Sequence, residues 1–163
     1  MINGQILVAC QNGDNVIRML GDVRLTLCIS FDNFILQMFE SRPFHSVIFD
    51  LREATCIDST TLGLMAKIAI TSRKSGHVNP LVLTNNPSIN RLLETMGFND
   101  IFDMVPEGKL PADAQTVLNI TECDALNEEQ VRQRVIEAHK ILMELNASNE
   151  SQFKALVDAL ERQ

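Results

Sequence analysis

The sequence predicts an α/β fold in which helices pack against one mixed sheet, with a helical hairpin at the C-terminal end. Short apolar runs alternate along the chain with segments whose apolar residues recur every three or four positions. The first two runs are joined by Asn-Gly, the strongest short signal of a β-hairpin. Strands that are separated by helices pair in parallel, so an initial antiparallel hairpin followed by such strands predicts a mixed sheet.

The first two strands and the first helix follow from local patterns. Gln5–Cys10 is apolar, Asn12-Gly13 supplies the turn, and Val16–Leu20 alternates as a returning strand does. A helix follows Gly21-Asp22, and Pro43 ends its pattern. Its apolar face is formed by Leu27, Phe31, Phe34, Ile35 and Met38.

The middle of the chain predicts two more strands and two more helices. Val47–Leu51 is almost wholly apolar, as expected for a strand that is covered on both faces. The helix from about Ser59 to Ser75 is apolar on several sides and should be largely buried. Pro80–Thr84 is another buried strand. Asn86-Pro87 then caps a helix that Gly97 ends.

The remaining residues predict a short strand, a linker and the helical hairpin. Ile101–Val105 closes a sheet domain that spans residues 1–105, and residues 106–126 form a linker in which Thr116–Ile120 is an extra edge strand. Residues 127–163 form the extension. It starts with a capping box at Asn127, in which Leu126 and Val131 are placed as a hydrophobic staple.

Both helices of the extension have an apolar stripe that needs a partner. Val131 begins the first stripe and Leu145 ends it, whereas Phe153 and Leu160 bound the second. Packing against the sheet domain is one interpretation. A homodimer contact through these helices, or an added surface for a regulatory partner, is the other.

Charge and composition exclude several classes of function. The formal net charge is −7, which disfavours binding to nucleic acid or anionic lipid by bulk electrostatics. The chain has no Trp or Tyr on which nucleic-acid bases could stack. No secretory signal is recognisable, and no apolar run approaches the roughly 20 residues that span a bilayer. We therefore expect a cytoplasmic protein that binds neither nucleic acid nor membrane.

Metal and cofactor motifs are also missing from the sequence. The cysteines, Cys10, Cys28, Cys56 and Cys123, are widely spaced, so neither a zinc site nor a disulfide framework is expected. The seven glycines are isolated and match neither glycine-rich nucleotide-binding pattern. We expect a chain without metal or cofactor that is not an enzyme.

Asp58 and Ser59 stand where the most apolar helix begins. The first backbone N–H groups of a helix lack intrahelical partners, so a short polar side chain caps them, and the same position favours an anion. The residues allow two interpretations of Ser59: a plain part of the helix cap, or a hydroxyl presented for phosphorylation by another protein.

The segment Val47–Ala66 resembles the core of a STAS domain. The family motif is roughly Asp-Ser-Ser/Thr-Gly-Leu-Gly, and this chain has Asp58-Ser59-Thr60-Thr61-Leu62-Gly63, with Thr61 where Gly is commoner. Leu20–Arg24 and Leu92–Phe98 match the flanks of the family pattern. The resemblance covers about residues 3–105. The combination is similar to the partner-switching anti-sigma factor antagonists of bacterial biofilm and flagellar regulation.

The resemblance implies a STAS-like fold and a regulated protein contact. Ser59 matches the phosphoacceptor, a separate serine kinase (in some systems the anti-sigma factor itself) adds the phosphate, and a serine phosphatase removes it. The unphosphorylated protein is then expected to bind an anti-sigma factor, and the phosphorylated protein to release it. The expected contact residues are Asp58, Thr60, Thr61 and Leu62, with Asp22 and Arg24 added from the loop after the first hairpin.

The phosphorylation hypothesis requires that solvent reach the Ser59 hydroxyl and that the C-terminal hairpin leave the surrounding surface uncovered. A constitutive scaffold that docks through the C-terminal helices is the main alternative, and a STAS domain that senses a small ligand is another. A serine hydrolase is disfavoured, because Ser59 lacks the Gly-x-Ser-x-Gly elbow and the sequence ties no histidine to it. Asp50, at the predicted end of a strand, is interpreted with Asp58 as a cap-and-turn residue.

Overall fold

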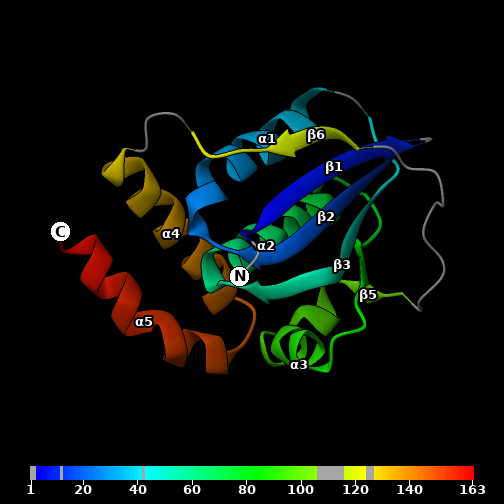
Figure 1. Ribbon diagram of the computed structural model, residues 1–163. Coiled ribbons are helices and arrows are strands. Elements are labelled where there is room, and N and C mark those ends of the chain that lie inside the picture. The colour runs from blue at the N-terminus through cyan, green and yellow to red at the C-terminus, as the bar shows by residue number, and fades with distance from the viewer. Residues whose placement is uncertain (1–2, 12, 42, 106–115, 124–126) are drawn as a thin grey trace.

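The computed structural model (Figure 1) describes residues 3–11, 13–41, 43–105, 116–123 and 127–163. Three sequence predictions fall partly or wholly outside this range. Asn12 of the hairpin turn, linker residues 106–115 and 124–126, and the staple residue Leu126 are not among the described residues.

A six-stranded mixed sheet forms the centre of the molecule, in the order β5-β4-β3-β2-β1-β6. β1 pairs antiparallel with β2 and β6, whereas β2, β3, β4 and β5 run parallel to one another. The predicted mixed sheet and the predicted edge strand are therefore both confirmed. The strands are β1 (Gln5–Gln11), β2 (Asp14–Val23), β3 (Ser46–Ile57), β4 (Leu81–Leu83), β5 (Asp103–Met104) and β6 (Thr116–Ile120).

Every predicted helix is present, with boundaries that differ by a few residues at most. The α-helices are α1 (Cys28–Ser41), α2 (Ser59–Lys74), α3 (Pro87–Thr95), α4 (Glu128–Met143) and α5 (Ala147–Glu161). Two 3-10 turns, η1 (Leu25–Leu27) and η2 (Phe98–Asp100), precede α1 and follow α3. Gly97 ends α3 in the left-handed conformation, with φ of 86°, which glycine adopts without a steric penalty.

Strand β3 is longer than its apolar run predicts, and this corrects the interpretation of Asp50. The strand continues beyond Leu51 to Ile57, where it pairs with Val23 of β2. Its second half is largely polar because several of its side chains are exposed, so the apolar pattern shows only the buried half. Asp50 consequently lies inside a strand and is not a turn residue.

The core lies between the sheet and the helices. Ile17, Met19 and Phe49 are completely buried on adjacent strands, and Leu64 of α2 is also completely buried. The Phe49 ring packs edge-on against Phe102, with 5.7 Å between ring centroids. Such pairs add to the stability that area burial alone supplies.

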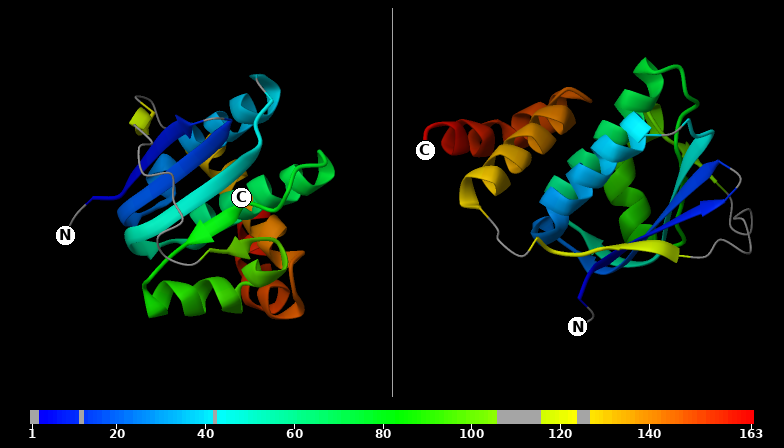
Figure 2. Two further views of the ribbon diagram at one scale, coloured as in Figure 1. Left: turned by 90° about the vertical axis from the view of Figure 1, so that its right-hand side faces the viewer. Right: turned by 90° about the horizontal axis from the view of Figure 1, so that it is seen from above.

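The C-terminal hairpin packs on this core. Helix α4 lies against α1 and α2, and α5 packs on α4 as the outermost element (Figure 2). Ala138 and Leu142 of α4 are completely buried, while Phe153 of α5 joins the same core cluster. The structure thus agrees with the interpretation that the hairpin packs on the sheet domain. The homodimer contact stays a prediction.

We expect Phe49→Ala to lower the free energy of unfolding by about 3–5 kcal/mol, because it removes a buried ring and leaves a cavity. Urea denaturation followed by circular dichroism would measure the change. Leu36→Ala on α1 is the control, because Leu36 is 57% exposed and should change stability by no more than about 0.5 kcal/mol. Equal losses for the two variants would contradict this description of the core.

Candidate functional site at the start of helix α2

Asp58 holds three backbone segments together at the start of α2. It is the N-cap, and its Oδ1 accepts a hydrogen bond from the Thr61 N–H at 2.9 Å. Its Oδ2 accepts one from the Leu25 N–H at 2.6 Å, at the start of η1. Its own N–H donates to the Val23 carbonyl at the end of β2, at 3.1 Å. Asp58 therefore caps the helix and positions the loop after β2.

Asp22 and Arg24 lie next to this cap, as the sequence predicts for residues of one site. The Arg24 Nε donates to the Asp22 carboxylate at 2.8 Å, and the Arg24 side chain is 64% exposed. Leu25, which bonds to Asp58, follows Arg24 directly. The structure thus brings Asp22, Arg24 and Asp58 together at one end of the sheet.

Thr60, Thr61 and Leu62 are placed differently from the expected contact surface. They are buried, with exposures of 3%, 2% and 1%. The reason is that α2 packs against α1 and α4 and its apolar side chains join those of the strands in the main core cluster, so the first turn of this helix is enclosed almost as soon as it begins. In this conformation none of the three side chains can touch a partner.

Ser59 is half-buried, and its hydroxyl is bonded within the chain. The Ser59 Oγ lies 2.8 Å from Nε2 of His139, a residue 80 positions away on α4. The expectation that the hairpin leaves this surface uncovered is therefore wrong for this conformation. His139 was not predicted as a site residue, because in the sequence it is only one of several polar positions on an amphipathic helix.

The hydrogen bonds of His139 define the direction of its contact with Ser59. The ring is 2% exposed, and its Nδ1 lies 2.7 Å from the Val135 carbonyl oxygen. A carbonyl can only accept a hydrogen bond, so Nδ1 carries a proton. In the neutral ring Nε2 is then an acceptor, and the Ser59 hydroxyl donates to it.

Gly63 brings α2 and α4 into close contact one turn after Ser59. A Cβ atom at Gly63 would lie 2.3 Å from the Ala138 carbonyl oxygen and 2.6 Å from the Ala138 Cβ. Only a residue without a side chain allows the two helix backbones to approach this closely. Gly63, the glycine of the predicted motif, therefore allows α4 to pack against α2.

A cluster of charged side chains also connects α4 to α1 and α2. Lys67 of α2 donates to Asp32 of α1 at 2.8 Å and pairs with Glu137 of α4. Arg134 of α4 approaches the second oxygen of Asp32, at 2.8 Å. Burial alone would lower the pKa of Lys67, but its bonds to the two carboxylates outweigh burial and raise that pKa. Lys67 thus stays charged while it joins three helices.

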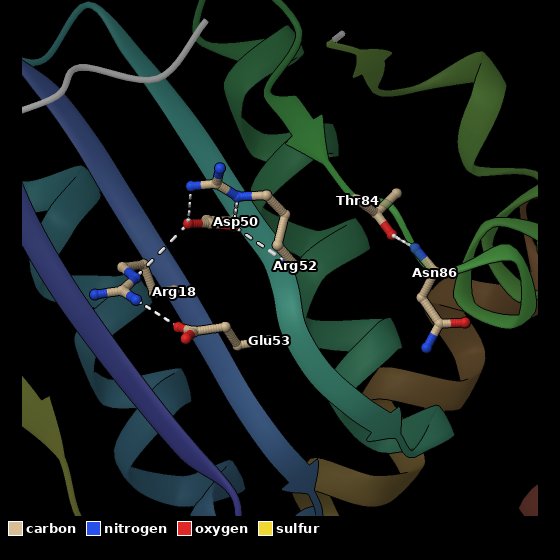
Figure 3. A network of polar contacts seen from close by, with 6 residues as sticks. All are labelled: Arg18, Asp50, Arg52, Glu53, Thr84 and Asn86. Atoms are coloured by element: carbon tan, nitrogen blue, oxygen red, sulfur yellow. Dashed lines mark hydrogen bonds and ion pairs between the residues drawn. The ribbon is translucent and has the colours of Figure 1, made fainter. Parts of the chain in front are cut away.

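A second polar network lies on the face of the sheet that is turned away from α1 and α2 (Figure 3). Asp50 is 5% exposed and accepts hydrogen bonds from the Arg52 backbone and guanidinium at 3.0–3.1 Å. Arg18 also pairs with Asp50, at 3.6 Å, and with Glu53. Asp50 on β3 therefore pairs with two cations, whereas Asp58 caps α2, so the two carboxylates have separate partners.

The contact between Ser59 and His139 is the type of pair that activates a serine nucleophile, although the sequence did not indicate it. The His139 ring is almost fully buried, and the backbones meet at Gly63 and Ala138. In this conformation α4 therefore covers the hydroxyl on the side of the histidine. Among the residues that the structure describes, no group of three or more His, Cys, Asp or Glu side chains could hold a metal ion.

Comparisons with known proteins show the fold. No protein-family model matches the sequence, and a comparison with curated proteins gives no significant match. Among solved structures, the chain is similar to the crystal structure of an anti-sigma factor antagonist from Mycobacterium paratuberculosis. The TM-score is 0.55 and the identity 18%, over 65% of this chain and 88% of that chain.

The STAS-like fold that the sequence resemblance predicts is thereby confirmed. About a third of this chain lies outside the match. In the described part of the chain, no helix has both the length and the apolar character needed to cross a membrane.

We expect Asp58→Ala to lower the free energy of unfolding by about 1–2 kcal/mol, because the α2 cap is lost and the Leu25 N–H loses its acceptor. Asp58→Asn is the matched control. It keeps an oxygen for the Thr61 N–H but places an NH2 group opposite the Leu25 N–H, so it should keep the helix cap and cost less than Asp58→Ala but more than nothing. Urea denaturation would compare the variants, and equal stability of Asp58→Ala and the wild type would contradict the capping role.

Proposed function

We propose that this chain is an anti-sigma factor antagonist whose partner contact is controlled by phosphorylation of Ser59. The observation that carries the proposal is the position of Ser59: it is the first residue of α2, directly after the Asp58 cap. This position lies on a fold shared with a protein that is named an anti-sigma factor antagonist. In the proposed cycle, the chain binds the anti-sigma factor when Ser59 is unmodified and releases it when Ser59 is phosphorylated.

The charge of a phosphate is sufficient to operate such a switch. Phosphorylation adds roughly −1.5 to −2 charge at neutral pH, next to Asp58 and on a chain with a net charge of −7. Juxtaposition of like charges across an interface costs on the order of several kcal/mol, and about 1.4 kcal/mol is a tenfold change in affinity. The proposal therefore needs no rearrangement of the sheet.

The proposed contact surface starts from the exposed residues around the cap. Arg24 is exposed and Leu25 is 39% exposed, and they border the half-buried Asp22 and Asp58. Thr60, Thr61 and Leu62 belong to this surface only in a conformation in which α4 has moved. A separate serine kinase, which by the resemblance is the anti-sigma factor itself in some systems, and a serine phosphatase complete the proposed cytoplasmic cycle.

A constitutive scaffold is the second candidate, and an apolar groove of about 780 Å³ favours it. The groove lies between the start of α4, the end of α5 and η1. Its lining includes Leu25, Val131, Leu156 and Leu160, of which Leu156 is 41% exposed. A partner bound in this groove would bind equally well whether or not Ser59 is phosphorylated, and Leu156→Glu would abolish its binding.

We expect Ser59→Ala to retain an anti-sigma factor in affinity capture from the native host, and Ser59→Asp to retain at least tenfold less, because the added charge opposes the contact. Quantitative mass spectrometry of the captured proteins would measure the ratio. Ser88→Asp is the matched control: Ser88 is an exposed serine in the first turn of α3 and should leave capture unchanged. Equal capture by Ser59→Ala and Ser59→Asp would contradict the switch, and loss on Leu156→Glu alone would support the scaffold.

A further inference from the structure

We propose that the α4–α5 hairpin is a cover for Ser59 within the same chain, and that docking of α4 and phosphorylation of Ser59 exclude each other. When the hairpin is docked, a kinase cannot reach the Ser59 hydroxyl. Once attached, the phosphate keeps α4 from returning to its place on α2. This inference rests on the proposed function, since it takes Ser59 as the phosphoacceptor, and it assigns the C-terminal extension a regulatory role.

The first support is that the Ser59 hydroxyl is already hydrogen-bonded to His139 of the same chain. The Ser59 Oγ is 2.8 Å from His139 Nε2, so the hydroxyl is held in a hydrogen bond to this ring, whose other nitrogen is bonded to the Val135 carbonyl. A kinase must approach the same oxygen in line with the phosphate that it transfers. That approach requires the histidine ring to leave.

The second support is that a phosphate on Ser59 would collide with the His139 ring where it now lies. A phosphoryl group brings three acceptor oxygens, whereas only the length of one hydrogen bond separates Ser59 from the ring of His139. Two further contacts hold the ring in this orientation. Its Nδ1 is bonded to its own helix, and Phe153 of α5 packs edge-on against it, with 5.0 Å between ring centroids.

The third support is that the backbone of α4, and not only the His139 side chain, packs closely against α2. At Gly63 the two backbones are so close that even a methyl group would lie 2.3 Å from the Ala138 carbonyl oxygen. This close contact opposes a slide of α4 along α2 that would make space for the phosphate. The change that admits a phosphate must lift α4 from the N-terminal half of α2.

The remaining contacts allow the hairpin to come away as a unit. α4 and α5 pack on each other, and α4 meets the sheet domain partly through charged side chains, Asp32, Lys67, Arg134 and Glu137, that water can solvate again. At the far end, Asn149 of α5 donates to the Met96 carbonyl at 2.9 Å. Because packed elements tend to open as cooperative units, a local conflict at Ser59 should weaken the docking of both helices.

Amide hydrogen exchange of the purified full-length protein tests the effect of the phosphate directly. Phosphoserine would be incorporated during translation at position 59 and, as the control, at Ser88. We expect the α4 and α5 amides to exchange at least tenfold faster with phosphoserine at position 59 and at the wild-type rate with phosphoserine at position 88. Unchanged protection of α4 and α5 in the first protein would overturn the proposal.

Thiol labelling tests the protection of the hydroxyl without a kinase. Ser59→Cys is combined with Cys56→Ser, so that position 59 carries the only thiol of its tryptic peptide, and exposed Cys10 is the internal reference. Burial raises the pKa of the Cys28 thiol to about 11, so this residue competes little for the reagent. We expect the thiol introduced at position 59 to be labelled at least tenfold more slowly than that of Cys10.

Gly63→Ala should remove this protection, because its methyl group prevents the seating of α4 while Ala favours the helical conformation of α2 itself. We expect it to raise the labelling rate of the thiol at position 59 at least fivefold. Ser75→Ala, at the exposed far end of α2, should leave the rate unchanged. Rapid labelling at position 59 before Gly63→Ala is introduced, or no increase after it, would overturn the proposal.

These measurements are independent of partner capture. If phosphoserine at position 59 opens the hairpin but capture does not depend on Ser59, the proposed function fails and the cover stands. If capture depends on Ser59 but the hairpin stays protected, the switch stands and the cover is refuted.

Discussion

The close approach of α2 and α4 is the constraint on which the site depends. Gly63 lets the backbone of α4 come within contact distance of α2, and one turn earlier this proximity places His139 against Ser59. A side chain at Gly63 would separate the helices and with them the serine and the histidine. Gly63, a glycine inside the predicted helix, therefore determines how closely α4 approaches the Ser59 hydroxyl.

The position of Ser59 is fixed by the hydrogen bonds of Asp58 at the end of the sheet. Asp58 bonds to the end of β2, to the start of η1 and to the first turn of α2, so the backbone at Ser59 is fixed from three directions. Strand β3 leads directly into Asp58, and the ion pairs of Asp50 stabilise this strand. Ser59 itself therefore has little freedom, and any change in its exposure must come from the helices that cover it.

The C-terminal hairpin combines features of a core element and of a regulatory one. Leu142 and Phe153 belong to the main hydrophobic cluster, which favours docking. The polar contacts of His139, Lys67 and Arg134 are specific but depend on single hydrogen bonds and ion pairs. Such contacts contribute modestly to stability, yet an unmatched charge among them is costly. A charge introduced at Ser59 would act directly on the contact with His139.

The sequence by itself determined the α/β class, the mixed sheet, the order of the helices and the position of Ser59 after the Asp58 cap. These features depend on local periodicity and capping, which neighbouring residues carry. Only the tertiary structure decided that Asp50 lies inside a long strand, that Thr60, Thr61 and Leu62 are buried, and that His139 contacts Ser59. Those outcomes depend on which helix packs against which, and a contact between residues 80 positions apart leaves no periodic trace in the sequence of either helix.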